Sequence, residues 1–176
     1  EMRQRSDGSL IQTLNAKFYV KNDLTNIYAA VQIFNEDYDA QNVISLGYDS
    51  FGLLFEEDHD HTLENGDNGV GIDIWSGGAA HSNNDWYYHG YWDLDVSAGK
   101  TNDGAFSWSH TAYPTEEAMG TYTFEMRIPL VGSDGDAYDL AITSLPSTVG
   151  FKIWFYERDE QMDGVYPDDP AVGKNY

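Results

Sequence analysis

Acidic side chains crowd a loop that follows a short apolar segment in the first half of the chain. Phe51, Leu53 and Phe55 alternate along this segment, which predicts a strand with one buried face. The loop after it carries the carboxylates of Glu56, Glu57, Asp58, Asp60, Glu64 and Asp67. At neutral pH these anions repel one another unless a cation lies among them, and oxygen ligands on a loop containing Gly and Asn suit calcium best. The spacing therefore predicts a calcium loop.

The predicted calcium ligands come from this loop and from a second acidic loop over residues 35–42. They are Asp58, Asp60, Thr62, Glu64 and Asp67, together with Asp37 and Asp39. The alternation from residue 58 resembles the first half of an EF-hand loop, but Leu63 replaces the required glycine and Gly69 replaces the bidentate Glu. We therefore do not expect an EF-hand. The alternatives are a solvated acidic turn without metal and, for residues 37 and 39, Asx-turns.

Aromatic residues gather further along the chain. Residues 86–92 read Trp-Tyr-Tyr-His-Gly-Tyr-Trp, the densest aromatic cluster in the sequence. A sugar ring stacks its C–H face on an aromatic plane, while its hydroxyls bond to acids and amides. The sequence therefore predicts a carbohydrate site with candidate residues Trp75, Asn84, Asp85, Trp86, Tyr88, Trp92 and Trp108. The alternative is that these rings pack in the core or cover a loop.

Length and composition indicate one folded domain. The chain has 176 residues, of which 41% are hydrophobic, and contains no segment typical of a linker between two cores. We expect an N-terminal arm or edge strand over 1–15, a β-sandwich domain over 16–160 and a C-terminal loop or tail over 161–176. The sequence has no cysteine, which excludes disulfides and thiolate metal sites.

The charge of the chain excludes two classes of partner. The formal net charge is -21, from 30 acidic and 9 basic residues. Nucleic acids and anionic membranes are bound mainly through lysine and arginine, so we expect neither as a partner. No apolar run approaches the roughly 20 residues that span a bilayer. We expect an extracellular or cell-surface protein whose signal peptide has already been removed.

Apolar periodicity predicts an all-β fold. Residues 16–20 and 122–128 alternate between apolar and polar, whereas 27–34 and 148–157 are nearly continuous apolar runs typical of central strands. The only helical suggestion is a single turn over 115–119. About eight short strands with turn residues between them predict an antiparallel β-sandwich, or jelly roll, without substantial helix.

Four segments resemble the core strands of family 9 carbohydrate-binding modules and their DOMON-like relatives. They are IYAAVQIFNED (27–37), DSFGLLF (49–55), YTFEMRIPL (122–130) and TVGFKIWF (148–155), in the same order and spacing. The resemblance spans residues 16–160 and implies a calcium-containing antiparallel β-sandwich, often a noncatalytic appendage of secreted enzymes or surface proteins. It also implies a saccharide clamped between two tryptophans. The chain departs from the family in lacking its usual first strand.

Two functions follow as expectations. The first is a noncatalytic, calcium-stabilised module that binds carbohydrate or a cell-surface glycan. The second is a self-assembling subunit of an extracellular filament or surface layer, in which the arm over 1–13 pairs with the open sheet edge of another copy and calcium bridges the acidic loops. We do not expect an enzyme, because paired acids such as Glu56 and Glu57 lie where calcium is predicted and no Gly-x-Ser-x-Gly elbow is present.

Overall fold

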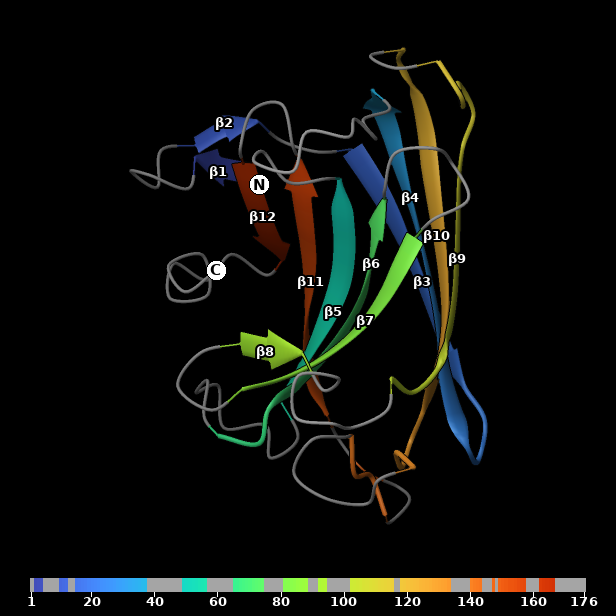
Figure 1. Ribbon diagram of the computed structural model, residues 1–176, viewed down its shortest axis with the longest axis vertical. Coiled ribbons are helices and arrows are strands. Elements are labelled where there is room, and N and C mark those ends of the chain that lie inside the picture. The colour runs from blue at the N-terminus through green and yellow to red at the C-terminus, as the bar shows by residue number, and fades with distance from the viewer. Residues whose placement is uncertain are drawn as a thin grey trace.

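The structure of this chain is a computed structural model. It describes residues 2–4, 10–12, 15–37, 49–56, 65–74, 81–88, 92–94, 102–115, 118–133, 140–143, 147, 149–157 and 162–166. Within these ranges every regular element is a strand, and no helix is long and apolar enough to cross a membrane. The strands form two antiparallel sheets that pack face to face (Figure 1).

The smaller sheet contains four strands in the order β3-β4-β10-β9. Their bounds are β3 Asn15–Asn22, β4 Asn26–Glu36, β10 Gly120–Pro129 and β9 Ala105–His110. Buried and less buried residues alternate along β4 and β10, as the period of two predicted. Pro129 is the last residue of β10, because proline has no N–H to continue the ladder.

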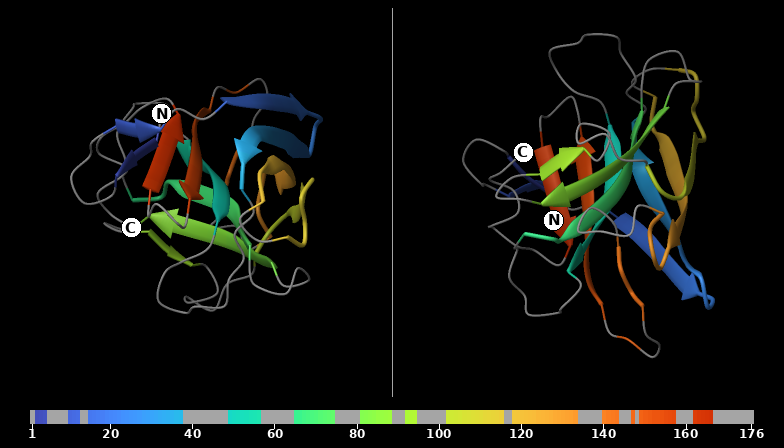
Figure 2. Two further views of the ribbon diagram at one scale, coloured as in Figure 1. Left: turned by 90° about the horizontal axis from the view of Figure 1, so that it is seen from above. Right: turned by 60° about the horizontal axis from the view of Figure 1, so that its bottom comes forward.

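The larger sheet contains eight strands in the order β2-β1-β12-β11-β5-β6-β7-β8. Their bounds are β2 Leu10–Gln12, β1 Met2–Gln4, β12 Met162–Tyr166, β11 Gly150–Glu157, β5 Ser50–Glu56, β6 Asn68–Ile74, β7 His81–Tyr88 and β8 Trp92–Leu94. The two ends of this sheet bend to the same side, away from the four-stranded sheet (Figures 1 and 2). The outer side of the larger sheet is therefore concave, and we call it the concave face.

The core between the sheets is built from large apolar side chains that alternate with outward-facing residues. Phe124 of β10 stacks on Phe51 of β5, with ring centroids 5.0 Å apart, and on Tyr122, at 5.2 Å. Tyr122, Phe124 and Phe51 are almost completely inaccessible to solvent. Burying side chains of this size contributes about 1.5–3 kcal/mol each. This cluster holds the two sheets together.

The all-β sandwich expected from the sequence is confirmed. The segments 16–20, 27–34 and 122–128 lie within β3, β4 and β10, and β11 starts at Gly150, inside the predicted segment 148–157. The single helical turn suggested over 115–119 is not seen in its described residues, because 115 is a bend and 118 and 119 have no regular secondary structure. Residues 116 and 117 of that segment lie outside the described ranges.

Four strands did not stand out in the sequence. β7 has a polar first half, and β12 lies in the stretch over 161–176 that was expected to be a loop or tail. β1 and β2 belong to the arm over 1–15, and β1 pairs with β12 of the same chain while β2 pairs with β1. All four are defined by their partners in the sheet, because their own residues show no clear alternation. The arm thus adds two strands to its own sheet.

Candidate functional site

The concave face is defined by the register of the larger sheet. Two rows of paired residues cross it, one formed by Trp154, Gly52, Gly71 and Asn84, the other by Leu54, Gly69, Trp86 and Leu94. The residues between these rows, such as Leu53 and Val70, belong to the core. Successive residues of a strand lie on opposite faces, so both rows lie on the side away from the four-stranded sheet.

The centre of the concave face consists of apolar side chains and glycines. Leu54 and Trp154 are only 5% and 7% exposed, although neither belongs to the core between the sheets. Beside them, Gly52, Gly69 and Gly71 bring no side chain and are buried as well. The larger sheet therefore buries apolar residues on both of its faces.

The aromatic segment borders this centre. β7 pairs with β8 so that Tyr88 is opposite Trp92, and Trp86 shares their face two residues earlier. Asn84 lies on the same face, opposite Gly71. The backbone register therefore brings four predicted carbohydrate-binding residues, Asn84, Trp86, Tyr88 and Trp92, to one end of the concave face. Clustered aromatic residues with an amide among them match the requirements of sugar stacking and hydrogen bonding.

Two other predicted carbohydrate-binding residues lie elsewhere. Asp85 belongs to the opposite face of β7, is 3% exposed, and accepts a hydrogen bond of 2.9 Å from the backbone N–H of Asp103. Trp108 lies on β9 of the smaller sheet and packs against the core, with its ring 5.9 Å from that of Tyr113 and 6.4 Å from that of Tyr122. Trp75 lies outside the described residues. The predicted set is thus divided between the two sheets.

The sequence did not show that Trp154 lies on the concave side of the larger sheet. It lies in the apolar run over 148–157, in which nearly every residue is hydrophobic and no alternation distinguishes the two faces. Its neighbours Ile153 and Phe155 pack in the core, which places Trp154 on the concave side. The sequence showed only that this strand is apolar on both faces, which is typical of a strand in a sheet covered on both sides.

Of the predicted calcium ligands, only Asp37 and Asp67 lie in the described ranges; Asp39, Asp58, Asp60, Thr62 and Glu64 lie outside them. Asp37 follows the end of β4 and is close enough to His110 to affect its pKa. Asp67 is buried and precedes Asn68, which pairs with Phe55 near the end of β5. No group of three His, Cys, Asp or Glu residues able to hold a metal occurs in the described part of the chain.

Asp37 and Asp67 lie at opposite ends of β5. The ring of His110, beside Asp37, is 4.4 Å from that of Tyr122, and the Tyr122 hydroxyl donates to the carboxylate of Asp49, just before β5 begins. Asp67 is at the other end of this strand, whose length of 7 residues corresponds to about 20 Å. These two carboxylates are therefore too far apart to bind the same ion.

His110 is a buried histidine beside the first of these carboxylates. Its Nε2 lies 3.1 Å from the backbone oxygen of Glu36, and its Nδ1 accepts a hydrogen bond of 3.3 Å from the N–H of Ala112. This pattern assigns the neutral tautomer with the proton on Nε2. Burial lowers the pKa of His110, while the Glu36 carbonyl and the charge of Asp37 act in the opposite direction. The ring of His110 is neutral and makes two hydrogen bonds to the backbone, so its role here is structural.

Comparisons with known proteins give one likeness of architecture. No protein-family model matches the sequence, and no curated protein matches it. Among solved structures, the chain matches a carbohydrate-binding module of family 9 from Caldicellulosiruptor kristjanssonii in complex with glucose. The match has a TM-score of 0.47 and 16% identity, and covers 93% of this chain and 73% of the module. The chain is similar in fold to this family 9 module. At this distance the likeness assigns no role to any residue.

Proposed function

We propose that this chain is a noncatalytic carbohydrate-binding module whose saccharide site lies on the concave face, at β7 and β8. The observation that supports it is the pairing of Tyr88 with Trp92, which gathers the aromatic residues of two strands on one side of a curved sheet. A concave apolar surface with a few polar groups is the usual form of a small-molecule site.

The site is tested by binding of neutral oligosaccharides. In isothermal titration calorimetry with glucose and xylose oligomers, Trp92→Ala and Tyr88→Ala are each expected to weaken the affinity about five- to thirtyfold, because each removes a stacking surface worth about 1–2 kcal/mol. Tyr113→Ala removes an exposed aromatic ring from the turn after β9 and serves as the matched control, with unchanged affinity expected. Equal affinities for all three variants and the parent chain would place the saccharide elsewhere.

We also propose that calcium binds the acidic loops of an extracellular or cell-surface protein. The support is the formal charge of -21. Because Asp37 and Asp67 are far apart, they belong to two distinct sites if both are ligands. An ion at about a hundred times its dissociation constant stabilises a fold by about 2.7 kcal/mol. We therefore expect millimolar calcium to raise the melting temperature, chelation to lower it, and magnesium at the same concentration to have less effect. A melting temperature indifferent to calcium and chelator would remove the calcium proposal.

Light scattering on the same samples separates the module from the assembly alternative. A module stays monomeric with and without calcium, whereas an assembling subunit forms large particles that chelation dissolves. Because β1 pairs with β12 of its own chain, strand exchange through the arm requires this pairing to open first. The alternative therefore has support from the sequence alone.

A further inference from the structure

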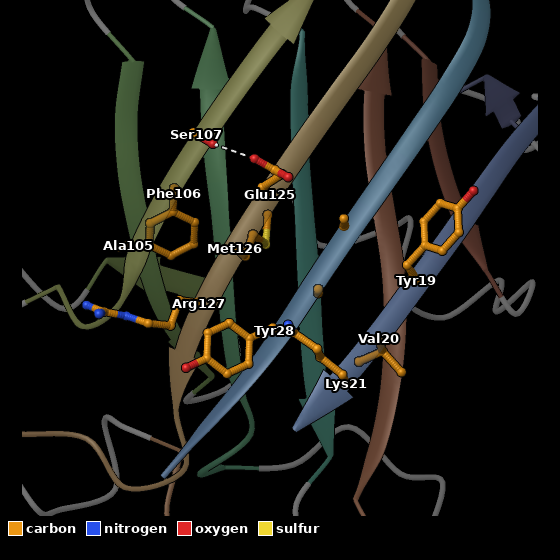
Figure 3. A pocket seen from close by; sticks show the side chains of 12 residues that line it. Tyr19, Val20, Lys21, Tyr28, Ala105, Phe106, Ser107, Glu125, Met126 and Arg127 are labelled. Atoms are coloured by element: carbon orange, nitrogen blue, oxygen red, sulfur yellow. Dashed lines mark hydrogen bonds between the residues drawn. The ribbon is translucent and has the colours of Figure 1, made fainter. Parts of the chain in front are cut away.

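A second groove crosses the outer face of the four-stranded sheet (Figure 3). Its volume is about 520 Å³, and it runs across β3, β4, β10 and β9. The side chains that matter for binding are Tyr19, Lys21, Tyr28, Glu125 and Arg127, around a floor at Ala30. Register explains the groove: one row pairs Lys21, Tyr28 and Arg127, the next pairs Tyr19, Ala30 and Glu125, and the alanine leaves space between the larger side chains.

The ring of Tyr28 is held in place by its neighbours. Its hydroxyl donates a 2.9 Å hydrogen bond to Asp23, and the Lys21 ammonium lies 5.1 Å from the ring centroid. Asp23 also accepts bonds of 2.7 Å from the backbone N–H groups of Thr25 and Asn26, which hold the pKa of its carboxyl well below the usual range. A ring fixed before binding loses little entropy when a ligand stacks on it.

Cationic side chains gather along this sheet face. Arg127 lies beside Tyr28 on the neighbouring strand (Figure 3). Within the described ranges no ion pair joins Lys21 or Arg127 to a carboxylate, and Glu125 instead accepts a hydrogen bond from the Ser107 hydroxyl, 3.4 Å away. Lys17 lies on the same face one row beyond the groove. Three of the 9 basic residues of the chain are thus on this sheet face.

This local excess of cations contrasts with the charge of the whole molecule. The formal net charge is -21, yet this sheet face offers three cations, Lys17, Lys21 and Arg127, against the carboxylates of Glu125 and Asp23. At physiological ionic strength the Debye length is about 8 Å, so charges farther than this from the groove are largely screened. Charge complementarity therefore favours an anionic ligand.

We propose that this groove binds a uronic acid residue of an acidic oligosaccharide. The apolar face of the pyranose ring stacks on Tyr28, with Tyr19, which is 52% exposed, available to the adjoining sugar. The planar carboxylate fits the fork of the Arg127 guanidinium, with Lys21 as a second cation. Glu125 accepts hydrogen bonds from ring hydroxyls. This site shares no residue with the concave face and does not depend on it.

Calorimetry with a galacturonic acid trimer as the probe tests the assignment. The titrations are made in 0.15 M salt, where the Debye length is about 8 Å. Arg127→Gln is expected to weaken binding about tenfold or more, and Lys21→Gln to weaken it less. Lys17→Gln makes the same charge change on the same face outside the groove, so its affinity should stay within about twofold of the parent chain. Tyr28→Phe should retain binding and Tyr28→Ala should lose it. The sugar contacts the ring of Tyr28, whereas its hydroxyl is hydrogen-bonded to Asp23.

Each contrary result identifies a different error. Equal losses in Lys17→Gln and Arg127→Gln would show general attraction by charge and overturn the site. Preference for a neutral trimer of the same length, or for a sulfated one, would overturn the carboxylate assignment. Failure of the trimer to bind at millimolar concentration would overturn the proposal altogether. Trp92→Ala should bind the acidic trimer normally, so that failure of the concave-face site and failure of the groove are distinguishable.

Discussion

Replacing Trp108 with alanine is expected to lower the free energy of unfolding by about 3 kcal/mol and to leave saccharide affinity unchanged. The tryptophan is opposite Phe124 in the register of the smaller sheet, and its ring packs against those of Tyr122 and Tyr113. Truncation removes these contacts and leaves a cavity beside the core. We expect a loss of stability at the lower end of the range for replacing a buried aromatic residue with alanine, because Trp108 is only partly buried.

Urea denaturation monitored by circular dichroism measures this loss as a lower midpoint at unchanged slope. Ser109→Ala, at an exposed position next to it on the same strand, should change the free energy by no more than about 0.5 kcal/mol. A Trp108→Ala protein that keeps its stability but no longer binds neutral oligosaccharides would contradict the packing role. It would restore the role that the sequence suggested for this residue.

Two glycines with similar backbone conformations are expected to differ sharply when each is changed to alanine. Gly104 and Gly66 have φ of 101° and 109°, a region that residues with a Cβ rarely adopt. A Cβ at Gly104 would lie 2.7 Å from the backbone oxygen of Arg127, whereas a Cβ at Gly66 would have no atom within 4 Å. Gly66→Ala therefore reports backbone strain alone, and Gly104→Ala reports strain together with a steric clash.

Strain of this kind costs about 1–3 kcal/mol, so Gly66→Ala should fall in that range. Gly104→Ala should cost at least about 1 kcal/mol more, because the neighbouring oxygen belongs to a paired strand and has little freedom to move. The loss of chain entropy in the unfolded state is the same for both substitutions and cancels in the comparison. Equal unfolding midpoints for the two variants would show that the loop before β9 yields to the added methyl group.

The residue before Gly104 anchors this loop through hydrogen bonds. The preceding residue, Asp103, donates its N–H to Asp85 of the larger sheet and accepts hydrogen bonds from the N–H and hydroxyl of Ser133, the latter at 2.9 Å. Asp103 therefore links three segments that are far apart in the sequence. Asp85, which the sequence suggested as a sugar ligand, instead helps to anchor this connection.

The sequence predicted best the elements whose evidence is local. Alternation along 122–128 gave both a strand and its buried face, and the apolar run over 27–34 gave a central strand. It also grouped Trp86, Tyr88 and Trp92 by their closeness in the sequence, and the pairing of β7 with β8 brings their positions to one face. The acidic loops were recognised by composition, and the ligands predicted at 58, 60, 62 and 64 stay predictions.

The partners of each strand were decided only by the tertiary structure. Trp108 and Trp86 are both aromatic residues in polar surroundings, yet one packs on the core of the small sheet and the other lies on the concave face. The groove over Ala30 combines side chains from four strands, none of which shows a binding motif of its own. Side-chain alternation is a property of one strand and can be read locally. Pairing depends on contacts between distant segments, and the sequence order does not reveal which of these the fold brings together.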